Sequence, residues 1–155
     1  MRTIIITAAM LSVSACATYE PPADRDIDNA VTVNQPYEKT WQRATEYFAN
    51  NNIPISNIAK DSGLIATDYK LGASSTFIDC GTVGTYEAFG DKNLNLNILV
   101  KENTPTTTDV RVNVFGTGRV VQTNLYGTTV GAGKAIDCVS TGALEDDLID
   151  YIRAG

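Results

Sequence analysis

Two stretches of the chain alternate strictly between apolar and polar residues, the pattern of β-strands that are buried on one face. In residues 94–98 leucine and isoleucine alternate with asparagine, and in residues 109–114 valine alternates with polar side chains. Shorter β-rich runs predict further strands at residues 31–34, 53–58, 64–69, 86–89 and 119–125. Several of these runs are separated by turn residues at 60–63, 90–92 and 102–106. The sequence therefore predicts a sheet of mostly antiparallel strands.

Two other stretches repeat their apolar residues at the spacing of an amphipathic helix. The first begins near Pro36, whose missing N–H is tolerated in a first helical turn, and ends in the asparagines at 50–52. Its apolar stripe consists of Tyr37, Trp41, Ala44, Tyr47 and Phe48. The second closes the chain, with Ser140 or Thr141 as its N-cap and acidic residues at 145–147 near the positive end of the helix dipole. Its apolar face consists of Leu144, Leu148 and Ile152.

Without the weaker run at 119–125, the predicted order of elements is β-α-β-β-β-β-β-α. One face of the predicted sheet is apolar and needs a cover, and two amphipathic helices are available to lie on it. We therefore expect an α+β fold in which a mostly antiparallel β-sheet carries both helices on one face. Residues 31–155 form a single domain in this interpretation, because they suffice for one hydrophobic core.

The first residues have the pattern of a secretory signal. A single positive charge at Arg2 precedes an apolar run that is too short to span a bilayer. The run ends in Val13, Ser14, Ala15 and Cys16. This tetrapeptide resembles the lipobox of bacterial lipoprotein precursors, which implies that residues 1–15 are a signal peptide and that Cys16 is acylated. Ala17 follows in place of an aspartate, which implies the outer membrane, with the protein facing the periplasm.

Between the predicted anchor and the domain, residues 16–30 combine two prolines with alternating charges and little apolar content. This composition predicts a tether. The full chain has a net charge of −6, and removal of Arg2 with the signal peptide makes the mature chain more negative. An acidic surface argues against nucleic acid as a partner and against a polybasic contact with anionic lipid. We therefore expect acyl chains on Cys16, rather than charge, to hold the protein to the membrane.

Beyond Cys16 the chain contains two cysteines, Cys80 and Cys138. In an oxidising periplasm an even pair predicts a disulfide bond. The alternatives are a metal site or a catalytic thiol, but the chain has no histidine and neither cysteine has another close to it in sequence. We therefore expect a bridge between Cys80 and Cys138 that fixes the final helix to the sheet.

The sequence contains no pattern of residues typical of a catalytic site. The absence of histidine excludes Ser-His-Asp and Cys-His arrangements. The glycine-rich residues 127–135 fail as a phosphate-binding loop, because Thr128 replaces the first required glycine and Ala135 replaces the magnesium ligand. The acidic residues lie in turns, in the tether and at a helix start, where solvation or capping accounts for them. We expect no catalytic residue, no metal and no cofactor, and interpret the chain as a non-enzyme.

One possible binding face is visible in the sequence. Asn93, Asn95 and Asn97 occupy the polar side of the strand predicted at 94–98. Their amides are able to hydrogen-bond a glycan or a partner strand, although a solvated outer face is the simpler interpretation.

Residues 31–69 resemble the small domains of BamC-type lipoproteins of the β-barrel assembly machinery. The likeness consists of a short strand, a helix with an aromatic stripe, and a run from Asp61 through Gly63 to Thr67 that opens the second strand of a hairpin. Residues 138–145 also resemble the end of small outer-membrane lipoproteins whose two cysteines pair. These resemblances imply a helix-on-sheet fold and a non-catalytic role.

The sequence leaves two functions open. The first is a membrane-anchored interaction or structural module that binds another envelope protein through a sheet edge or an exposed face. The alternative is a small domain that binds a lipid or glycan between helix and sheet, which requires an apolar pocket beneath Trp41.

Overall fold

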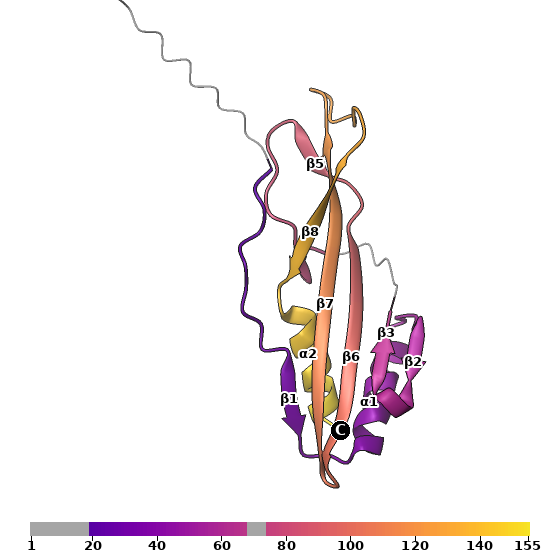
Figure 1. The fold of residues 1–155 in the computed structure, drawn as a ribbon. Coiled ribbons are helices and arrows are strands. Elements are labelled where there is room, and N and C mark those ends of the chain that lie inside the picture. The colour runs from indigo at the N-terminus through magenta and orange to yellow at the C-terminus, as the bar shows by residue number, and fades with distance from the viewer. Residues whose placement is uncertain (1–18, 68–73) are drawn as a thin grey trace, which may run out of the picture.

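The computed structural model describes residues 19–67 and 74–155, which form one antiparallel eight-stranded sheet and two helices (Figure 1). The elements are β1 (Ala30–Val33), α1 (Tyr37–Asn50), β2 (Asn57–Ala59), β3 (Leu64–Ala66), β4 (Ile78–Asp79), β5 (Glu87–Phe89), β6 (Asn93–Thr104), β7 (Thr107–Gln122), β8 (Lys134–Ser140) and α2 (Ala143–Arg153). The predicted α+β class is therefore confirmed. Among the described residues no helix is long and apolar enough to cross a membrane.

The long strand β7 organises the sheet, since four of the other strands, β1, β5, β6 and β8, pair with it directly. Its 16 residues extend over about 50 Å at about 3.3 Å per residue. One edge of β7 pairs with β6 and then with β5, and the other edge pairs with β1 and then with β8. Figure 1 shows the result as a tall, narrow molecule built around the β6–β7 hairpin.

The predicted turn at 90–92 does not reverse the chain. Glu87 pairs with Gln122 and Asn93 pairs with Thr117, so β5 and β6 follow one another along the same edge of β7. The N–H of Gly90 still donates to the carbonyl of Arg119 at 2.7 Å. Residues 90–92 therefore interrupt one long edge with a short irregularity.

The strands predicted at 109–114 and 119–125 form the single strand β7 instead of two. Glycine usually weakens a strand, yet here Gly116 and Gly118 lie where another chain segment approaches closely. A Cβ on Gly116 would lie 2.8 Å from the Cβ of Cys138, and one on Gly118 would lie 3.4 Å from the sulfur of Cys138. The strand β8, which brings Cys138 there, was missed in the sequence because residues 127–135 were interpreted only as a loop.

Both helices pack on one face of the sheet, as expected, and cover its lower half in Figure 1. The alternating apolar residues of β6 and β7 that lie beneath them are Leu94, Leu96, Ile98, Val100, Val110, Val112 and Val114. The helices contribute the buried residues Trp41, Ala44, Tyr47, Phe48, Leu144, Leu148, Ile149 and Ile152. The predicted stripe is thus correct except at Tyr37, which is only half-buried and donates its hydroxyl proton to the carbonyl of Lys60 at 2.5 Å.

The start of α2 differs from the prediction, because the N-cap position is Gly142 and not Ser140 or Thr141. Strand β8 continues to Ser140, and Gly142 makes the turn into the helix with a left-handed φ of 88°. The hydroxyl of Ser140 accepts the N–H of Gly142 at 3.1 Å and donates to the carboxylate of Glu145 at 2.8 Å. Glu145, only 2% exposed, is therefore held in the first helical turn by a hydroxyl that comes from the strand.

The turn between β2 and β3 explains why the run at 61–67 contains a glycine. Gly63 has a φ of 70°, and a Cβ at this position would lie 1.8 Å from the carbonyl oxygen of Val100. The N–H of Val100 donates to the carbonyl of Gly63 at 2.8 Å, which attaches the turn to β6. Both strands of this hairpin are shorter than predicted, and the part of the second that was predicted at 68–69 lies outside the described residues.

The segment before β1 was expected to be a tether, but its described part, residues 19–29, lies along the domain. Glu20 and Thr82 exchange two backbone hydrogen bonds of 3.0 Å. Arg25 forms an ion pair with Asp79 at 2.8 Å, and the carbonyl of Asn29 accepts the N–H of Val112 at the same distance. Figure 1 shows this segment descending from the upper end of the molecule to β1.

Candidate functional site

The second face of β6 and β7 is the candidate site, because the described part of the chain places no helix on it. The strict alternation of both strands turns every second side chain toward this uncovered face. Its residues include Asn93, Asn95, Asn97, Leu99, Asp109, Arg111, Asn113, Phe115 and Thr117. The three asparagines singled out in the sequence therefore lie together on this face.

Three asparagine side chains form a hydrogen-bonded row across the uncovered face. The amide N–H of Asn29 donates to Asn113 Oδ1 at 3.1 Å, and the amide N–H of Asn113 donates to Asn97 Oδ1 at 2.8 Å. Asn113 and Asn97 are direct partners in the β6–β7 register, while Asn29 reaches the row from the residue before β1. The row holds the polar side chains in fixed orientations.

An exposed aromatic ring lies next to this row. Phe115 is 53% exposed and stands directly opposite Asn95 on the neighbouring strand. An aromatic ring beside fixed amides is able to contact an apolar surface of a partner while the amides hydrogen-bond its polar groups. This part of the uncovered face therefore combines rigidity, an apolar contact and hydrogen-bonding groups.

Two open depressions adjoin the asparagine row. One, of about 690 Å³, lies between residues 25–29 and the strands β7 and β8, with Asn113, Phe115 and Val139 among its lining residues. The other, of about 440 Å³, lies where β1, β6 and β7 meet and is lined in part by Leu99 and Arg111. Both have mixed polar and apolar walls, so the face is contoured rather than flat.

The sequence indicated Asn93, Asn95 and Asn97 but not Asn29, Asn113 or Phe115. For Asn113 and Phe115 a signal was present, since both continue the polar positions of the alternating run that begins at Asp109. The contribution of Asn29 depends on the pairing of β1 with β7, and no local pattern in the sequence specifies that pairing.

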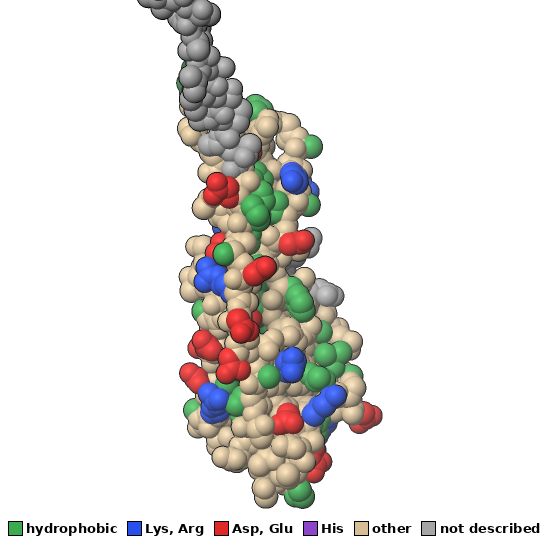
Figure 2. All heavy atoms as spheres, turned by 60° about the vertical axis from the view of Figure 1, so that its left-hand side comes forward, with side chains coloured by type: hydrophobic (Ala, Val, Ile, Leu, Met, Phe, Trp, Pro, Cys, Tyr) green, Lys and Arg blue, Asp and Glu red, His purple; other side chains and the backbone are tan. Residues whose placement is uncertain are grey.

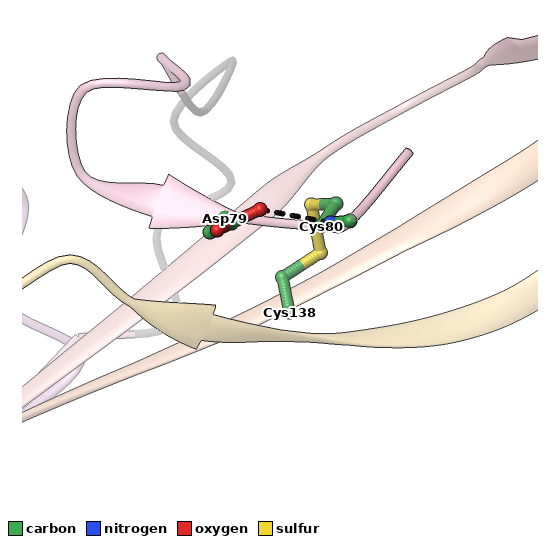
Figure 3. Close-up of a disulfide and its surroundings, with 4 residues drawn as sticks. Asp79, Cys80 and Cys138 are labelled. Atoms are coloured by element: carbon green, nitrogen blue, oxygen red, sulfur yellow. Dashed lines mark hydrogen bonds between the residues drawn. A yellow bond between two sulfur atoms is a disulfide. The ribbon is translucent and has the colours of Figure 1, made fainter. Parts of the chain in front are cut away.

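The two cysteines predicted to pair do form a disulfide bond (Figure 3). Their Cα atoms lie 4.2 Å apart across 58 positions of sequence, and both residues are buried. Cys80 follows β4, while Cys138 lies within β8. The bridge therefore joins the β4 segment to β8, and the expectation that it fixes the final helix to the sheet is wrong, because β8 continues beyond Cys138 before α2 begins.

The surroundings of the bridge also hold the N-terminal segment in place. Asp79 accepts the N–H of Gly81 at 2.9 Å, the contact drawn in Figure 3, and pairs with Arg25 through its other oxygen. These contacts, first the Gly81 N–H and then Arg25, lower the pKa of the Asp79 carboxyl below its ordinary value. A lowered pKa means that the ionised carboxylate stabilises this region at neutral pH and that the stabilisation is lost as the pH falls through the acid range.

The remaining predicted features do not form a site in the described residues. The glycine-rich run 127–135 belongs to the connection between β7 and β8 and to the start of β8, so it is not followed by the helix that a phosphate-binding loop requires. Within residues 19–67 and 74–155, no group of three or more His, Cys, Asp or Glu side chains is placed to hold a metal ion. The predicted acylation site, Cys16, lies outside the described residues.

Comparison with known proteins adds no family to these observations. No protein-family model matches the chain, and none of the curated proteins matches it significantly. The likeness to lipoprotein precursors and to BamC-type domains therefore stays a prediction that rests on the residues themselves.

Proposed function

We propose that the chain is an exported lipoprotein, anchored to the outer membrane through Cys16, whose uncovered sheet face binds another envelope protein without catalysis. The observation that carries the proposal is the ordered face itself, with Phe115 exposed beside the hydrogen-bonded row of Asn29, Asn113 and Asn97. Side chains that are already fixed lose little conformational entropy when a partner binds, which favours recognition.

Export and anchoring have two lines of support. The first is the match of Val13–Cys16 to a lipobox after a basic and apolar start. The second is the Cys80–Cys138 bridge, since structural disulfides persist in oxidising compartments such as the periplasm and are rare in the cytosol. Together they favour a periplasm-facing location with acyl chains as the attachment.

A protein partner is favoured over a small ligand held between helix and sheet. The ligand alternative requires space beneath Trp41, yet Trp41 is only 7% exposed and belongs to a core with the fully buried Phe48 and Ile98. The uncovered face, in contrast, presents the exposed ring of Phe115 beside ordered amides, and aromatic side chains often carry much of the binding energy of an interface.

A glycan is the second candidate for the same face. The specific observation is that the amide of Asn95 lies directly opposite the exposed ring of Phe115. A sugar ring stacked on an aromatic side chain presents its hydroxyl groups to neighbouring amides, and the register of β6 and β7 supplies that combination.

The anchor is tested by Cys16→Ser, because only a thiol forms the thioether that carries the lipid. We expect the variant to lose the mass increment of the acyl chains and to leave the membrane fraction or accumulate as precursor. Mass spectrometry and membrane fractionation measure this, with Ser14→Ala as a control that keeps a small residue before the cleavage site. Wild-type protein that carries no acyl mass would refute the anchor.

The binding face is tested by a photo-crosslinking amino acid introduced at Phe115 or at Asn95 in intact cells. We expect both positions to capture the same envelope protein, identified by mass spectrometry. The matched control is Lys39, which is exposed on α1 on the opposite side of the sheet and should not capture it. Identical products from all three positions would contradict a specific face.

Alanine substitutions at two of the same positions distinguish a glycan ligand from a protein partner. If the face binds peptidoglycan, then purified acylated protein should sediment with isolated sacculi, and Phe115→Ala should weaken this while Lys39→Ala leaves it unchanged. Absence of sedimentation together with a specific crosslink at Phe115 assigns the face to a protein.

A further inference from the structure

The connection between β7 and β8 carries the two most exposed large apolar side chains among the described residues. Leu125 is 82% exposed and Tyr126 is 91% exposed. Val130 on the returning segment and Tyr86 beside β5 are also exposed. The backbone of Tyr86 accepts the N–H of Thr123 at 2.8 Å, so these four side chains belong to one end of the molecule. We name Leu125, Tyr126 and Val130 the apolar tip.

Leu125 and Tyr126 of the apolar tip lie in a turn whose backbone is fixed by hydrogen bonds. Asn124 organises it: its side-chain oxygen accepts the N–H groups of Tyr126 and Thr128, each at 2.9 Å, and its carbonyl accepts the N–H of Gly127 at 2.9 Å. Gly127 has a φ of 74°, which a glycine adopts without strain. Leu125 and Tyr126 are therefore displayed outward by a preformed backbone, and little ordering is required when they are buried by a partner.

The charge around the tip differs from that of the rest of the chain. Residues 120–133 carry no charged side chain, and the first charged residues on either side are the basic Arg119 and Lys134, in a chain of net charge −6. The nearest acid in the strand register, Glu87, lies opposite Gln122 and accepts the N–H of Gly84 at 3.1 Å. Figure 2 shows hydrophobic side chains reaching the upper end of the molecule, while most acidic side chains on that face lie lower.

The position of the chain's first described residue indicates what the tip faces. Residues 19–30 enter the structure at the same end as β5 and the β7–β8 connection (Figure 1). Tyr19 lies three positions after Cys16 in the sequence, a distance of about 10 Å at most for an extended chain. An acyl anchor on Cys16 therefore holds the bilayer close to this end and away from the β6–β7 turn at Thr106.

We propose that the apolar tip inserts into the interfacial layer of the bilayer beside the acyl anchor. A leucine and a tyrosine suit this region, because tyrosine combines an apolar ring with a polar hydroxyl at headgroup depth. With one contact at Cys16 and a second at the tip, the domain stands upright and holds its uncovered face perpendicular to the membrane. The inference rests on the anchor proposed above, which supplies the first contact.

A tryptophan at the tip reports insertion. Tyr126→Trp is compared with Thr106→Trp, which places the same probe in the turn at the far end of β6 and β7. Each protein is purified with its anchor and reconstituted into phosphatidylcholine vesicles with or without brominated acyl chains. The single native tryptophan, Trp41, is buried and supplies a constant background. We expect emission from position 126 to shift to shorter wavelength and to be quenched by brominated lipid, and emission from position 106 to do neither.

Two further measurements make the result decisive. Leu125→Asp added to Tyr126→Trp should reduce the quenching, since a carboxylate resists burial in the interface. Unquenched emission from position 126, or equal quenching at both positions, would overturn the inference. Concentration-dependent self-association that Leu125→Asp abolishes, without quenching, would also overturn it and assign the tip to a second copy of the chain.

Failure of the anchor is distinguished from failure of the tip by the mass of the purified protein. If Cys16 carries no acyl chain, the proposed function fails, and the thiol of Cys16 is then coupled to a maleimide lipid before the same measurement. The other two of the chain's three cysteines form the bridge, so this coupling is specific. Quenching of the coupled Tyr126→Trp protein would support the tip independently, and its absence would reject the tip.

Discussion

Replacing both Cys80 and Cys138 by alanine should lower the free energy of unfolding by about 4 kcal/mol. The bridge closes a loop across 58 positions of sequence, and on the chain-entropy model a loop of this size restricts the unfolded chain by about that amount. The native state also depends on it locally, because β4 has two residues and, within the described part of the chain, pairs only with β8. Urea unfolding followed by circular dichroism measures the change.

Wild-type protein in which the bridge has been reduced is the control for the double variant. Reduced wild-type protein should unfold at nearly the same urea concentration as the alanine variant, because both lack the same bridge. In a Cys16→Ser background, unfolded and non-reduced protein should give no free thiol, since the two remaining cysteines are paired. Two titratable thiols in that sample would show that the bridge does not form.

The sequence was most informative where a repeated local pattern decided the structure. The alternation of 94–98 and 109–114 identified the strands at the centre of the sheet, and the stripe through Trp41 and Phe48 identified α1. A buried strand face and a buried helix stripe each repeat with a period that is visible in the chain itself. The apolar residues that this periodicity marks are the ones that the tertiary structure buries.

The errors arose where a long-range contact decided the structure. Residues 109–114 and 119–125 were predicted as two strands, but the approach of Cys138 from β8 makes Gly116 and Gly118 suitable within one continuous strand. Similarly, charges and prolines at 19–29 suggested a tether, whereas the partners of this segment, Thr82, Asp79 and Val112, are distant in sequence. Composition does not specify partners of that kind.

The candidate face was predictable in part, because part of it follows from the alternation within a single strand. Period two places Asn93, Asn95 and Asn97 on one side of β6, so their common face followed from the sequence. The row through Asn113 to Asn29 depends on the registers of β6 with β7 and of β1 with β7. That face is uncovered because both helices pack on the opposite face of the sheet. The sequence predicted this packing only through the apolar pattern of the strands.

Trp41→Ala should lower the free energy of unfolding by about 3–5 kcal/mol, the usual cost of removing a large buried aromatic side chain. Trp41 is 7% exposed, and its ring stacks on Tyr37 with a centroid separation of 6.0 Å. The substitution leaves a cavity between α1 and β6 that the surrounding side chains fill only in part. Circular dichroism is the appropriate probe, because the variant contains no tryptophan.

The same variant distinguishes a core role for Trp41 from a ligand-binding one. If Trp41 is a core residue, crosslinking from Phe115 should decrease only as far as the folded population decreases, and it should recover at lower temperature. Lys39→Ala, on the exposed side of α1, should change stability by less than about 0.5 kcal/mol. A Trp41→Ala protein of nearly wild-type stability would mean that the indole lines a cavity, and the small-ligand alternative would then replace the interaction module.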